Sequence, residues 1–382
     1  MKWEYKTLDQ LGIVSRGKSK HRPRNDPTLF GGEYPFIQTA DVKAAPFYIS
    51  EYSATYNEKG LEQSKLWHAG TLCITIAANI ADTGILAMDA CFPDSVMGFV
   101  PYDEISDVRF VKYSFDILQA KCKKISQGTA QDNLSWEKLS TIQFPAPPFA
   151  TQKRIADILS TYDEMIENNQ KQIKLLEETA QRLYKEWFVD LRFPGHETTH
   201  IVDGIPEGWS KEELGNIAVL RAGGDRPKVF SKVKTVECSV PVFSNGTEDE
   251  GLYGFTNLAE IYDPCVTISA RGSVGYTCLR KVAFVPIVRL ISVIPKQIEV
   301  EYLFYFLKNM VFESNGVAQQ QITVPMIKNK QVVLPAKTVI NLFVSKIRPM
   351  MDLREKLKNK ISALSEARNR LLPKLISGEI EV

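Results

Sequence analysis

Between residues 152 and 189, apolar residues recur at alternating intervals of four and three. The stretch contains no Pro and no Gly, and nine of the ten positions in this seam are apolar. Such spacing, held over more than four heptads, is typical of a coiled coil rather than of an ordinary surface helix. Asn169 is the polar exception, of the kind that fixes register at some cost in stability. The seam positions are Ile155, Leu159, Tyr162, Ile166, Asn169, Ile173, Leu176, Ala180, Leu183 and Trp187.

A second seam with the same spacing lies near the end of the chain, and eight of its ten positions are apolar. Pro349 lacks a backbone donor, which predicts that the helix kinks or begins there, and Pro373 predicts the same near its end. We therefore expect an interrupted helix whose long regular part covers about 350–372. Its seam positions are Phe343, Ile347, Met350, Arg354, Leu357, Ile361, Leu364, Arg368, Leu371 and Leu375.

The two seams belong to a repeat of about half the chain. A shift of 188 residues brings four residues of the second half onto identical residues of the first: Gly316, Ala318, Gln319 and Pro335 onto Gly128, Ala130, Gln131 and Pro147. Near the start of each half, Leu214-Gly215 after Trp209 matches Leu11-Gly12 after Trp3. The period is too long for a solenoid, whose repeats run roughly 20 to 50 residues. It indicates a duplicated unit, a variable domain followed by a helix.

Residues 1–148 contain short strand-like runs broken by turn residues, together with a helical stretch near 113–124. This pattern predicts a mixed α+β domain without regular β-α-β alternation. Residues 200–336 repeat it, with a helical stretch at 302–311. The expected fold is two similar α+β domains, 1–148 and 200–336, joined by two long antiparallel coiled-coil helices with an internal pseudo-twofold. The helices are assigned to 149–193 and 337–382, the latter with a tail.

Charge is uneven along a chain of 382 residues whose net charge is only +2. Two acid-free stretches, 10–25 and 264–298, each carry five basic residues, and 314–351 carries five more. Such stripes suit contact with a polyanion, although a solvated face balanced by acids elsewhere is the alternative. The first two stripes are Arg16, Lys18, Lys20, Arg22 and Arg24, then Arg271, Arg280, Lys281, Arg289 and Lys296.

Other compositional features narrow the function classes. Six Cys without a Cys-x-x-Cys pair and only four His argue against a structural zinc site. The N-terminus has no apolar signal core, and the longest apolar stretch, near 72–81, is far short of a bilayer span. We expect a reduced, soluble, cytoplasmic protein that does not engage a membrane.

One motif suggests nucleotide chemistry. Gly12–Ser19 fits the pattern G-x-x-x-x-G-K-S, which in a phosphate loop follows a strand and opens a helix at the Lys. Here Pro23 and Pro27 follow in a basic run that is a poor helix former. A DNA-facing or solvated basic loop is favoured, and a P-loop nucleotide hydrolase is the minor alternative.

Arg271-Gly272-Ser273-Val274-Gly275 follows a strand-like run and can present its Arg to a base edge or a phosphate. Arg to guanine is the commonest specific contact in the major groove, whereas Asn prefers adenine. The first copy carries Asn79 at the matching place, so the two domains would read different half-sites. The alternative is a hairpin turn whose Arg side chain is solvated and does not contact DNA. Further candidate DNA contacts are Arg221, Arg226, Lys228, Ser273 and Arg289.

Amide residues follow the matching glycines of the two copies, Gln131-Asp132-Asn133 and Gln319-Gln320-Gln321. Amides can read bases, but they also brace turns, and their recurrence in both copies favours the structural role. The sequence contains no His-Glu-x-x-His, no G-x-S-x-G and no Asn-Pro-Pro-Phe-like tetrapeptide. Joined to the duplicated architecture, this points to a recognition subunit whose chemistry sits on its partners, with no metal or cofactor of its own.

Four motifs occur in a characteristic order: Phe144-Pro145-Ala146-Pro147-Pro148 with Gln152–Ala156, Glu186–Pro194, Ile205–Trp209 with Leu214-Gly215, and Leu372–Ile380. Together they resemble the specificity subunit of Type I restriction–modification enzymes, over essentially the whole chain. The resemblance implies two target-recognition domains that each read half of a split, asymmetric site on double-stranded DNA. It also implies helices that set the unread gap and dock two modification subunits.

On that resemblance, the modification subunits bind S-adenosylmethionine and methylate adenine. Restriction subunits then add translocation and cleavage driven by ATP with Mg. Two departures concern the second helix: Val339-Ile340-Asn341 replaces Thr151-Gln152-Lys153, and Pro349 has no counterpart. A coiled-coil scaffold that holds proteins and ignores DNA is the other alternative.

Overall fold

A computed structural model describes residues 3–76, 81–126, 136–312 and 321–382. The chain divides into two compact units, and each is described by itself. Unit 1 comprises 1–172 with 356–382, and unit 2 comprises 173–355. Two long helices, α6 (Phe149–Tyr184) and α10 (Lys337–Ser377), contribute a stretch to each unit.

Unit 1 is built around a five-stranded sheet in the order β2-β10-β7-β8-β4. Neighbouring strands run antiparallel except β4 and β8, which run parallel. A smaller sheet has the order β5-β3-β9-β6, and β1 pairs with β11. The strands are β1 Glu4–Lys6, β2 Gly12–Arg16, β3 Phe30–Phe36, β4 Tyr48–Ile49, β5 Ala54–Tyr56, β6 Leu66–Trp67, β7 Leu72–Thr75, β8 Thr83–Leu86, β9 Ala90–Cys91, β10 Val96–Pro101 and β11 Phe144–Ala146. The helices are α1 Leu8–Leu11, α2 Thr39–Ala44, α3 Glu58–Glu62, α4 Val108–Ser126 and α5 Trp136–Leu139.

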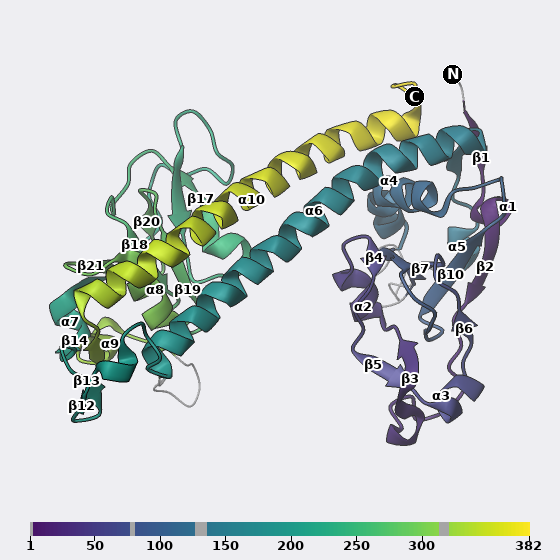
Figure 1. The fold of residues 1–382 in the computed structure, drawn as a ribbon. Helices are drawn as coiled ribbons and strands as arrows, with labels where there is room; N and C mark the ends of the chain where they lie inside the picture. The colour runs from purple at the N-terminus through teal and green to yellow at the C-terminus, as the bar shows by residue number, and fades with distance from the viewer. Residues whose placement is uncertain (1–2, 77–80, 127–135, 313–320) are drawn as a thin grey trace. The chain divides into compact units, whose positions relative to one another are not determined.

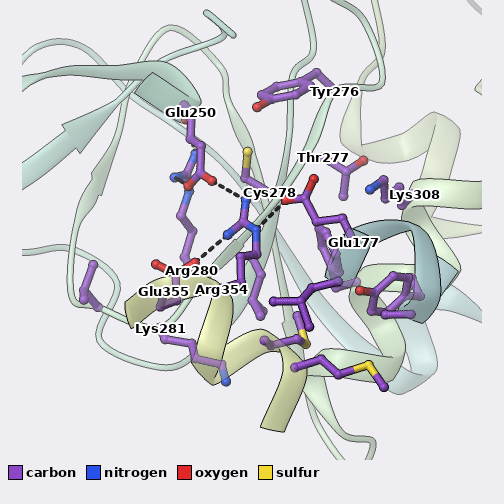
Figure 2. Close-up of a pocket in the computed structure, with 18 of the residues that line it drawn as sticks. Glu177, Glu250, Tyr276, Thr277, Cys278, Arg280, Lys281, Lys308, Arg354 and Glu355 are labelled. Atoms are coloured by element: carbon purple, nitrogen blue, oxygen red, sulfur yellow. Dashed lines mark hydrogen bonds and ion pairs between the residues drawn. The ribbon is translucent and has the colours of Figure 1, made fainter. Parts of the chain in front are cut away.

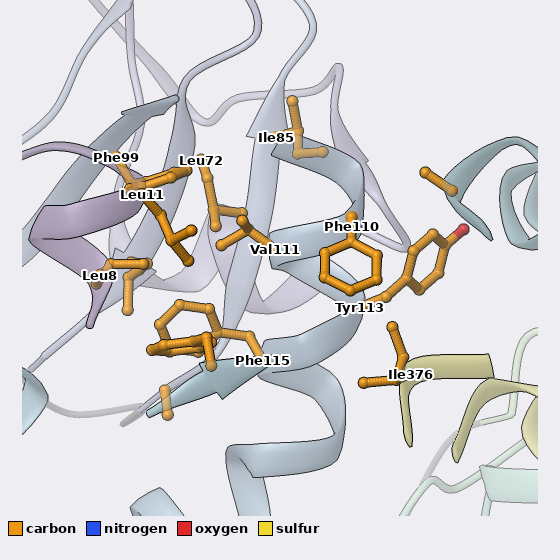
Figure 3. Packing of buried hydrophobic residues seen from close by; sticks show 14 of the residues in the cluster. Leu8, Leu11, Leu72, Ile85, Phe99, Phe110, Val111, Tyr113, Phe115 and Ile376 are labelled. Carbon is orange, nitrogen blue, oxygen red and sulfur yellow. The ribbon is translucent and has the colours of Figure 1, made fainter. Parts of the chain in front are cut away.

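The core of unit 1 lies between its main sheet and α4. Leu72 and Phe99 from the sheet, with Phe110 and Phe115 from α4, are almost fully buried there (Figure 3). Ile155 and Leu159 from α6, and Leu375 and Ile376 from α10, complete the same cluster. Burial of this apolar surface therefore fixes the helices to the domain as well as holding the sheet together.

Unit 2 repeats this plan, which confirms the predicted duplication. Its four-stranded sheet has the order β15-β21-β18-β19, matching β2-β10-β7-β8, and β14 pairs with β22 as β1 does with β11. The helix α8 lies against β18 and β19 of this sheet (Figure 1). A second sheet has the order β17-β16-β20. The strands are β12 Ile201–Val202, β13 Ile205–Pro206, β14 Ser210–Glu213, β15 Ala218–Ala222, β16 Val240–Phe243, β17 Leu252–Thr256, β18 Cys265–Ile268, β19 Thr277–Arg280, β20 Val285–Pro286, β21 Ile291–Pro295 and β22 Gln331–Leu334. The helices are α7 Leu214–Ile217, α8 Val300–Asn309 and α9 Val324–Lys328.

The predicted match at the start of the two halves is shifted. Leu214 begins α7 as Leu8 begins α1, and both helices lead directly into the first strand of the main sheet. Leu214 therefore corresponds to Leu8 rather than to Leu11. The shared Leu-Gly pair misled the alignment because Gly12 begins strand β2 while Gly215 lies inside α7.

The expectation that Pro349 interrupts the second helix is wrong. α10 runs without a break from Lys337 to Ser377, through both Pro349 and Pro373. Pro349 is exposed, whereas Phe343 and Ile347 on the inner face are buried in a cluster of unit 2. Burying such side chains contributes about 1.5–3 kcal/mol each, so the two together offset the roughly 3 kcal/mol cost of an internal proline.

The other departure in the second helix does not shorten it either. Gln152 near the start of α6 is buried, and its Nε2 donates to the carbonyls of Ile105 (2.9 Å) and Pro147 (2.8 Å). Ile340, which stands in its place on α10, is buried in an apolar cluster instead. Each residue therefore anchors the first turns of its helix by a different kind of contact.

The four–three seams face inward within each unit, and no seam position is exposed. The two Arg residues of the second seam each meet a carboxylate on the other helix. In unit 1 Arg368 pairs with Asp163, and in unit 2 Arg354 pairs with Glu177. α6 ends in a π-helical turn, Lys185–Val189, where Trp187 is buried against Phe343.

Candidate nucleic-acid interface

The loops at one edge of the unit 2 sheets enclose a concavity of about 430 Å³. Five segments of unit 2 meet there: the loop after β15, the loop after β16, strand β17, the turn between β18 and β19, and the loop after β20. Two predicted DNA contacts, Arg226 and Arg271, line it together. The lining residues are Arg226, Ser244, Asn245, Gly246, Tyr253, Arg271, Gly272, Ile287 and Val288.

Arg271 lies in a tight turn at the tip of the β18–β19 hairpin. The turn is closed by the amide of Ser269 donating to Tyr276 O (2.8 Å) and that of Gly275 donating to Ser269 O (2.9 Å). Gly272, directly after Arg271, has φ +68, a conformation that suits glycine. The Arg271 side chain is exposed and reaches Gln321 Oε1 at 3.4 Å. The turn therefore places an exposed guanidinium among the residues that line the concavity, which fits both a DNA contact and a solvated turn residue.

Val288 and Arg289 form a strained stretch of backbone beside this turn. Both residues are left-handed, with φ of 52 and 62, which is rare for a β-branched residue such as Val288. Their amides donate to the carbonyls of Gly224 (2.9 Å) and Gly223 (3.0 Å). Strain of this kind costs about 1–3 kcal/mol per residue and clusters at functional sites. It holds the predicted contact Arg289, which is exposed, directly after a lining residue.

Two lining residues of the concavity, Arg226 and Tyr253, also take part in contacts between cations and aromatic rings. The Arg226 guanidinium lies 5.0 Å from the ring centre of Phe230, and Lys232 Nζ lies 3.8 Å from that of Tyr253. The same segment carries Lys234, also exposed. Lys232 and Lys234 were not predicted from the sequence. A search for lysines alternating with apolar residues would have found them.

The other candidates of unit 2 are exposed but do not line the concavity. Arg221 is the penultimate residue of β15, Lys228 follows Arg226 in the loop, and Ser273 lies in the hairpin turn. The second basic stripe, in contrast, is divided between two roles. Arg280, Lys281 and Lys296 are bound to acceptors inside unit 2, although both lysines are exposed, and Arg271 and Arg289 are exposed as well.

In unit 1 the first basic stripe lies on β2 and the loop after it. The loop is fastened to the domain because the amides of Gly17 and Lys18 donate to Val96 O (2.8 Å) and Phe92 O (3.1 Å). Arg24 makes two hydrogen bonds to Asp94, at 2.7 and 2.8 Å, and Arg22 lies 3.9 Å from the same carboxylate.

The remaining cations of this loop are Arg16, Lys18 and Lys20. Arg16 and Lys20 are exposed and Lys18 is half-buried. Within the described ranges none of the three side chains has an ion pair, in contrast to Arg22 and Arg24. They are therefore the members of the stripe available to a phosphate backbone.

This geometry does not fit a phosphate loop. Such a loop needs backbone amides that are free to point at phosphate oxygens. In Gly12–Ser19 the first five residues are strand β2, and the amides of Gly17 and Lys18 are already used. The next helical element is a 3₁₀ turn at Pro27–Leu29 rather than a helix opening at Lys18.

Several predicted features lie outside the described residues: Asn79, Gln131-Asp132-Asn133, Gln319 and Gln320. The comparison of Asn79 with Arg271 therefore stays a prediction. In the part of the chain that the structure covers, no group of three or more His, Cys, Asp or Glu side chains could hold a metal ion. None of the described helices has the length and apolar character to cross a membrane.

A family model described as the type I restriction modification DNA specificity domain matches residues 1–178 and 206–363. The chain belongs to this family. The two matched segments correspond to the two copies of the repeat. As a member, the chain is a DNA specificity subunit, a type of protein that recognises DNA and is not itself a catalyst.

Individual relatives agree with this assignment. The type I restriction enzyme MjaIX specificity subunit of Methanocaldococcus jannaschii is 26% identical over 408 residues, covering 100% of this chain and 94% of that protein. A putative type I specificity subunit of Mycoplasma pneumoniae is 27% identical over 282 residues, covering 69% and 79%. The crystal structure of a type I restriction–modification S subunit from M. genitalium has the same fold, with a TM-score of 0.67 and 16% identity over 98% of this chain and 96% of that one.

Proposed function

We propose that this specificity subunit reads a split, asymmetric DNA site, one half through each unit, by contacts at the loops described above. The observation that carries the proposal is the concavity of unit 2, where Arg226 and Arg271 come together from segments far apart in the sequence. An Arg side chain at the tip of a hairpin can enter the major groove and bind guanine through O6 and N7. The neighbouring Lys228, Lys232 and Lys234 supply contacts to phosphates, which position the protein without reading sequence.

In unit 1 the corresponding role falls to Arg16, Lys18 and Lys20 for the DNA backbone, with Asn79 as the proposed base reader. Because the two units carry different side chains at the matching hairpins, the halves of the site would differ in sequence. The unread gap between them would follow from the lengths of α6 and α10. Helices of 36 and 41 residues span about 54 and 62 Å at 1.5 Å per residue.

The catalytic steps belong, on this proposal, to partner proteins. Two modification subunits dock on the chain, bind S-adenosylmethionine and methylate adenine in the site. Restriction subunits add translocation and cleavage driven by ATP with Mg. The complex works on chromosomal and incoming DNA in the cytoplasm.

The test is single-molecule sequencing of DNA from a host that expresses the chain with its cognate modification subunit, and from one that lacks the chain. A methylated split motif found only with the chain supports the proposal and gives the target. Exchange of residues 200–336 for those of another member should then change one half of the motif alone. If the complex forms and no chain-dependent mark appears, the chain is a coiled-coil scaffold without DNA specificity.

A further inference from the structure

One loop, Asn245–Gly251, called here the bracing loop, connects two of the segments that line the concavity of unit 2. At its first residue, Asn245 Nδ2 donates to Val288 O (2.7 Å), and Asn245 Oδ1 accepts from the amide of Ala270 (2.7 Å). One amide side chain therefore ties together the segments that carry Arg271 and Arg289. Any shift of the bracing loop moves both segments.

The other end of the bracing loop is strained. Asp249 and Glu250 are consecutive left-handed residues, with φ of 45 and 55, and neither is glycine. Such a conformation persists only where the surroundings impose it, and it is a recognised mark of functional segments. The next residue, Gly251, also has positive φ, and its carbonyl accepts from the amide of Ser244 (2.8 Å).

Glu250 is held by two arginines from different parts of unit 2. Arg280 on β19 is only 4% exposed, donates to Glu250 O at 2.5 Å, and lies 3.7 Å from the ring centre of Phe243. Arg354 on α10 donates to the Glu250 carboxylate at 2.9 Å and to Glu177 on α6 at 2.5 Å. Figure 2 shows Glu250, Arg354 and Glu177 facing one another across this network.

Ion pairs contribute to holding this part of the loop. The network lines a cavity of about 550 Å³, whose other walls come from α6, α8, α10 and the β18–β19 hairpin. Burial lowers the pKa of Arg280, so the carboxylate beside it also supports the charged form of that arginine.

We propose that Glu250 is a positioning residue for half-site recognition, through which the helix pair sets the shape of the base-reading concavity. Arg354 fixes Glu250, Glu250 holds the strained bracing loop, and Asn245 at the other end of that loop fixes the Arg271 turn. The role rests on the proposed function and deepens it: the helices fix the geometry of the reading site in unit 2 besides setting the gap. Glu250 itself has no contact with DNA in this scheme.

The test compares Glu250→Gln with Glu248→Gln, which removes an exposed carboxylate from the same loop. The full chain, in complex with its modification subunit, is titrated with the cognate duplex and with duplexes substituted in either half. For Glu250→Gln, discrimination in the half read by unit 2 should fall roughly tenfold, while discrimination in the other half stays unchanged. Glu248→Gln should match the wild type. Faster hydrogen exchange at the Ala270 amide in Glu250→Gln alone should accompany the loss.

Arg354→Lys gives a second measurement if Glu250→Gln does not fold. Lysine keeps the charge but lacks the planar fork that serves Glu177 and Glu250 at once, so an intermediate loss in the same half is expected. A selective wild type with equally selective Glu250→Gln or Arg354→Lys variants would overturn the positioning role alone. A wild type without any sequence preference would overturn the proposed function and this role with it.

Discussion

Arg368 on α10 donates a hydrogen bond to the carboxylate of Asp163 on α6. The equivalent contact in unit 2 joins Arg354 and Glu177, which lie fourteen residues back along α10 and fourteen further along α6. Fourteen residues are two heptads, so both pairs obey one antiparallel register. The two polar residues of the second seam are thus matched to carboxylates of the first helix, rather than being flaws in the pattern.

The Asp163 pair should contribute measurably to stability. Asp163 also accepts a hydrogen bond from the Tyr113 hydroxyl (2.5 Å), and its side chain is 11% exposed. Asp163→Asn should lower the free energy of unfolding by about 2 kcal/mol because it leaves Arg368 poorly paired. Urea unfolding measures the change, with Glu164→Gln, an exposed neighbour on α6, as the control. Adding Arg368→Met should recover part of the loss; a further drop would contradict a pairwise role.

Arg271 should act at one base pair. Arg271→Ala removes a guanidinium from the tip of the hairpin without changing the glycines that shape the turn. Binding should lose about 1–3 kcal/mol of discrimination at one position in the half-site read by unit 2. Competition binding with singly substituted duplexes measures this. Arg271→Lys should fail to restore it, because lysine cannot bind two acceptors in one plane. An unaltered preference would show that Arg271 is only a solvated turn residue.

The cations Arg16, Lys18 and Lys20 of unit 1 should strengthen DNA binding to the same degree for every DNA sequence. Replacing Arg16, Lys18 and Lys20 with Gln should weaken binding to all sequences alike. The slope of log K against log salt should become shallower by about one for each phosphate that the variant no longer neutralises. Arg24→Gln is the matched control, because Arg24 is already bound to Asp94 and should change the slope less. A change in sequence preference instead would place these residues at base edges.

Pro349 should lower the stability of α10. Pro349→Ala restores a backbone donor in the helix interior while leaving the inner face unchanged. The free energy of unfolding should rise by about 1–3 kcal/mol, because the regained helical hydrogen bond and the removed ring clash outweigh the greater flexibility that alanine gives the unfolded chain. Lys346→Ala, at an exposed position nearby, should change little. Destabilisation by Pro349→Ala would mean that the proline is required for the path of the helix.

Glu301 should make unit 2 sensitive to acid. Burial alone would raise the pKa of this carboxyl, but hydrogen bonds from Arg348 (3.2 Å) and an ion pair with Lys281 (3.1 Å) outweigh it and hold the pKa below its ordinary value of 4.5. A lowered folded-state pKa contributes stability above the unfolded value, and that stability disappears as pH falls through the folded pKa.

Urea unfolding between about pH 5 and pH 3 should therefore show a fall in stability that Glu301→Gln reduces. Glu207→Gln, an exposed position in unit 2, is the control. An equal pH dependence in wild type and Glu301→Gln would assign the acid sensitivity to other carboxyls.

The repeat and the helices were predictable because their signals are periodic and local. The seam from Ile155 to Trp187 follows from the spacing of apolar residues alone. Pro349 was misjudged because local propensity says nothing about the burial of Phe343 and Ile347 against the rest of unit 2. Tertiary packing overrode a local preference there.

The proposed base-reading site was predictable only in part. Arg271 was found because a glycine-rich turn after a strand is a local pattern. Asn245 and Glu250 gave no such signal, because their partners lie far along the chain. Asn245 bonds to Ala270, 25 residues away, and Glu250 to Arg354, 104 residues away. Roles that arise from contacts at such separations have no motif to reveal them.

Two short antiparallel strand pairs, β1–β11 and β14–β22, lie where the chain enters and leaves each domain. In both, the strand that enters the domain is hydrogen-bonded to the strand that leaves it. The two ends of the segment between the paired strands therefore stay adjacent, whatever sequence lies between them. Lengthening a closed loop costs little, about 0.6 kcal/mol per doubling. A chain built this way can exchange the whole reading surface of one domain while the paired strands, and the helix that follows them, remain the same.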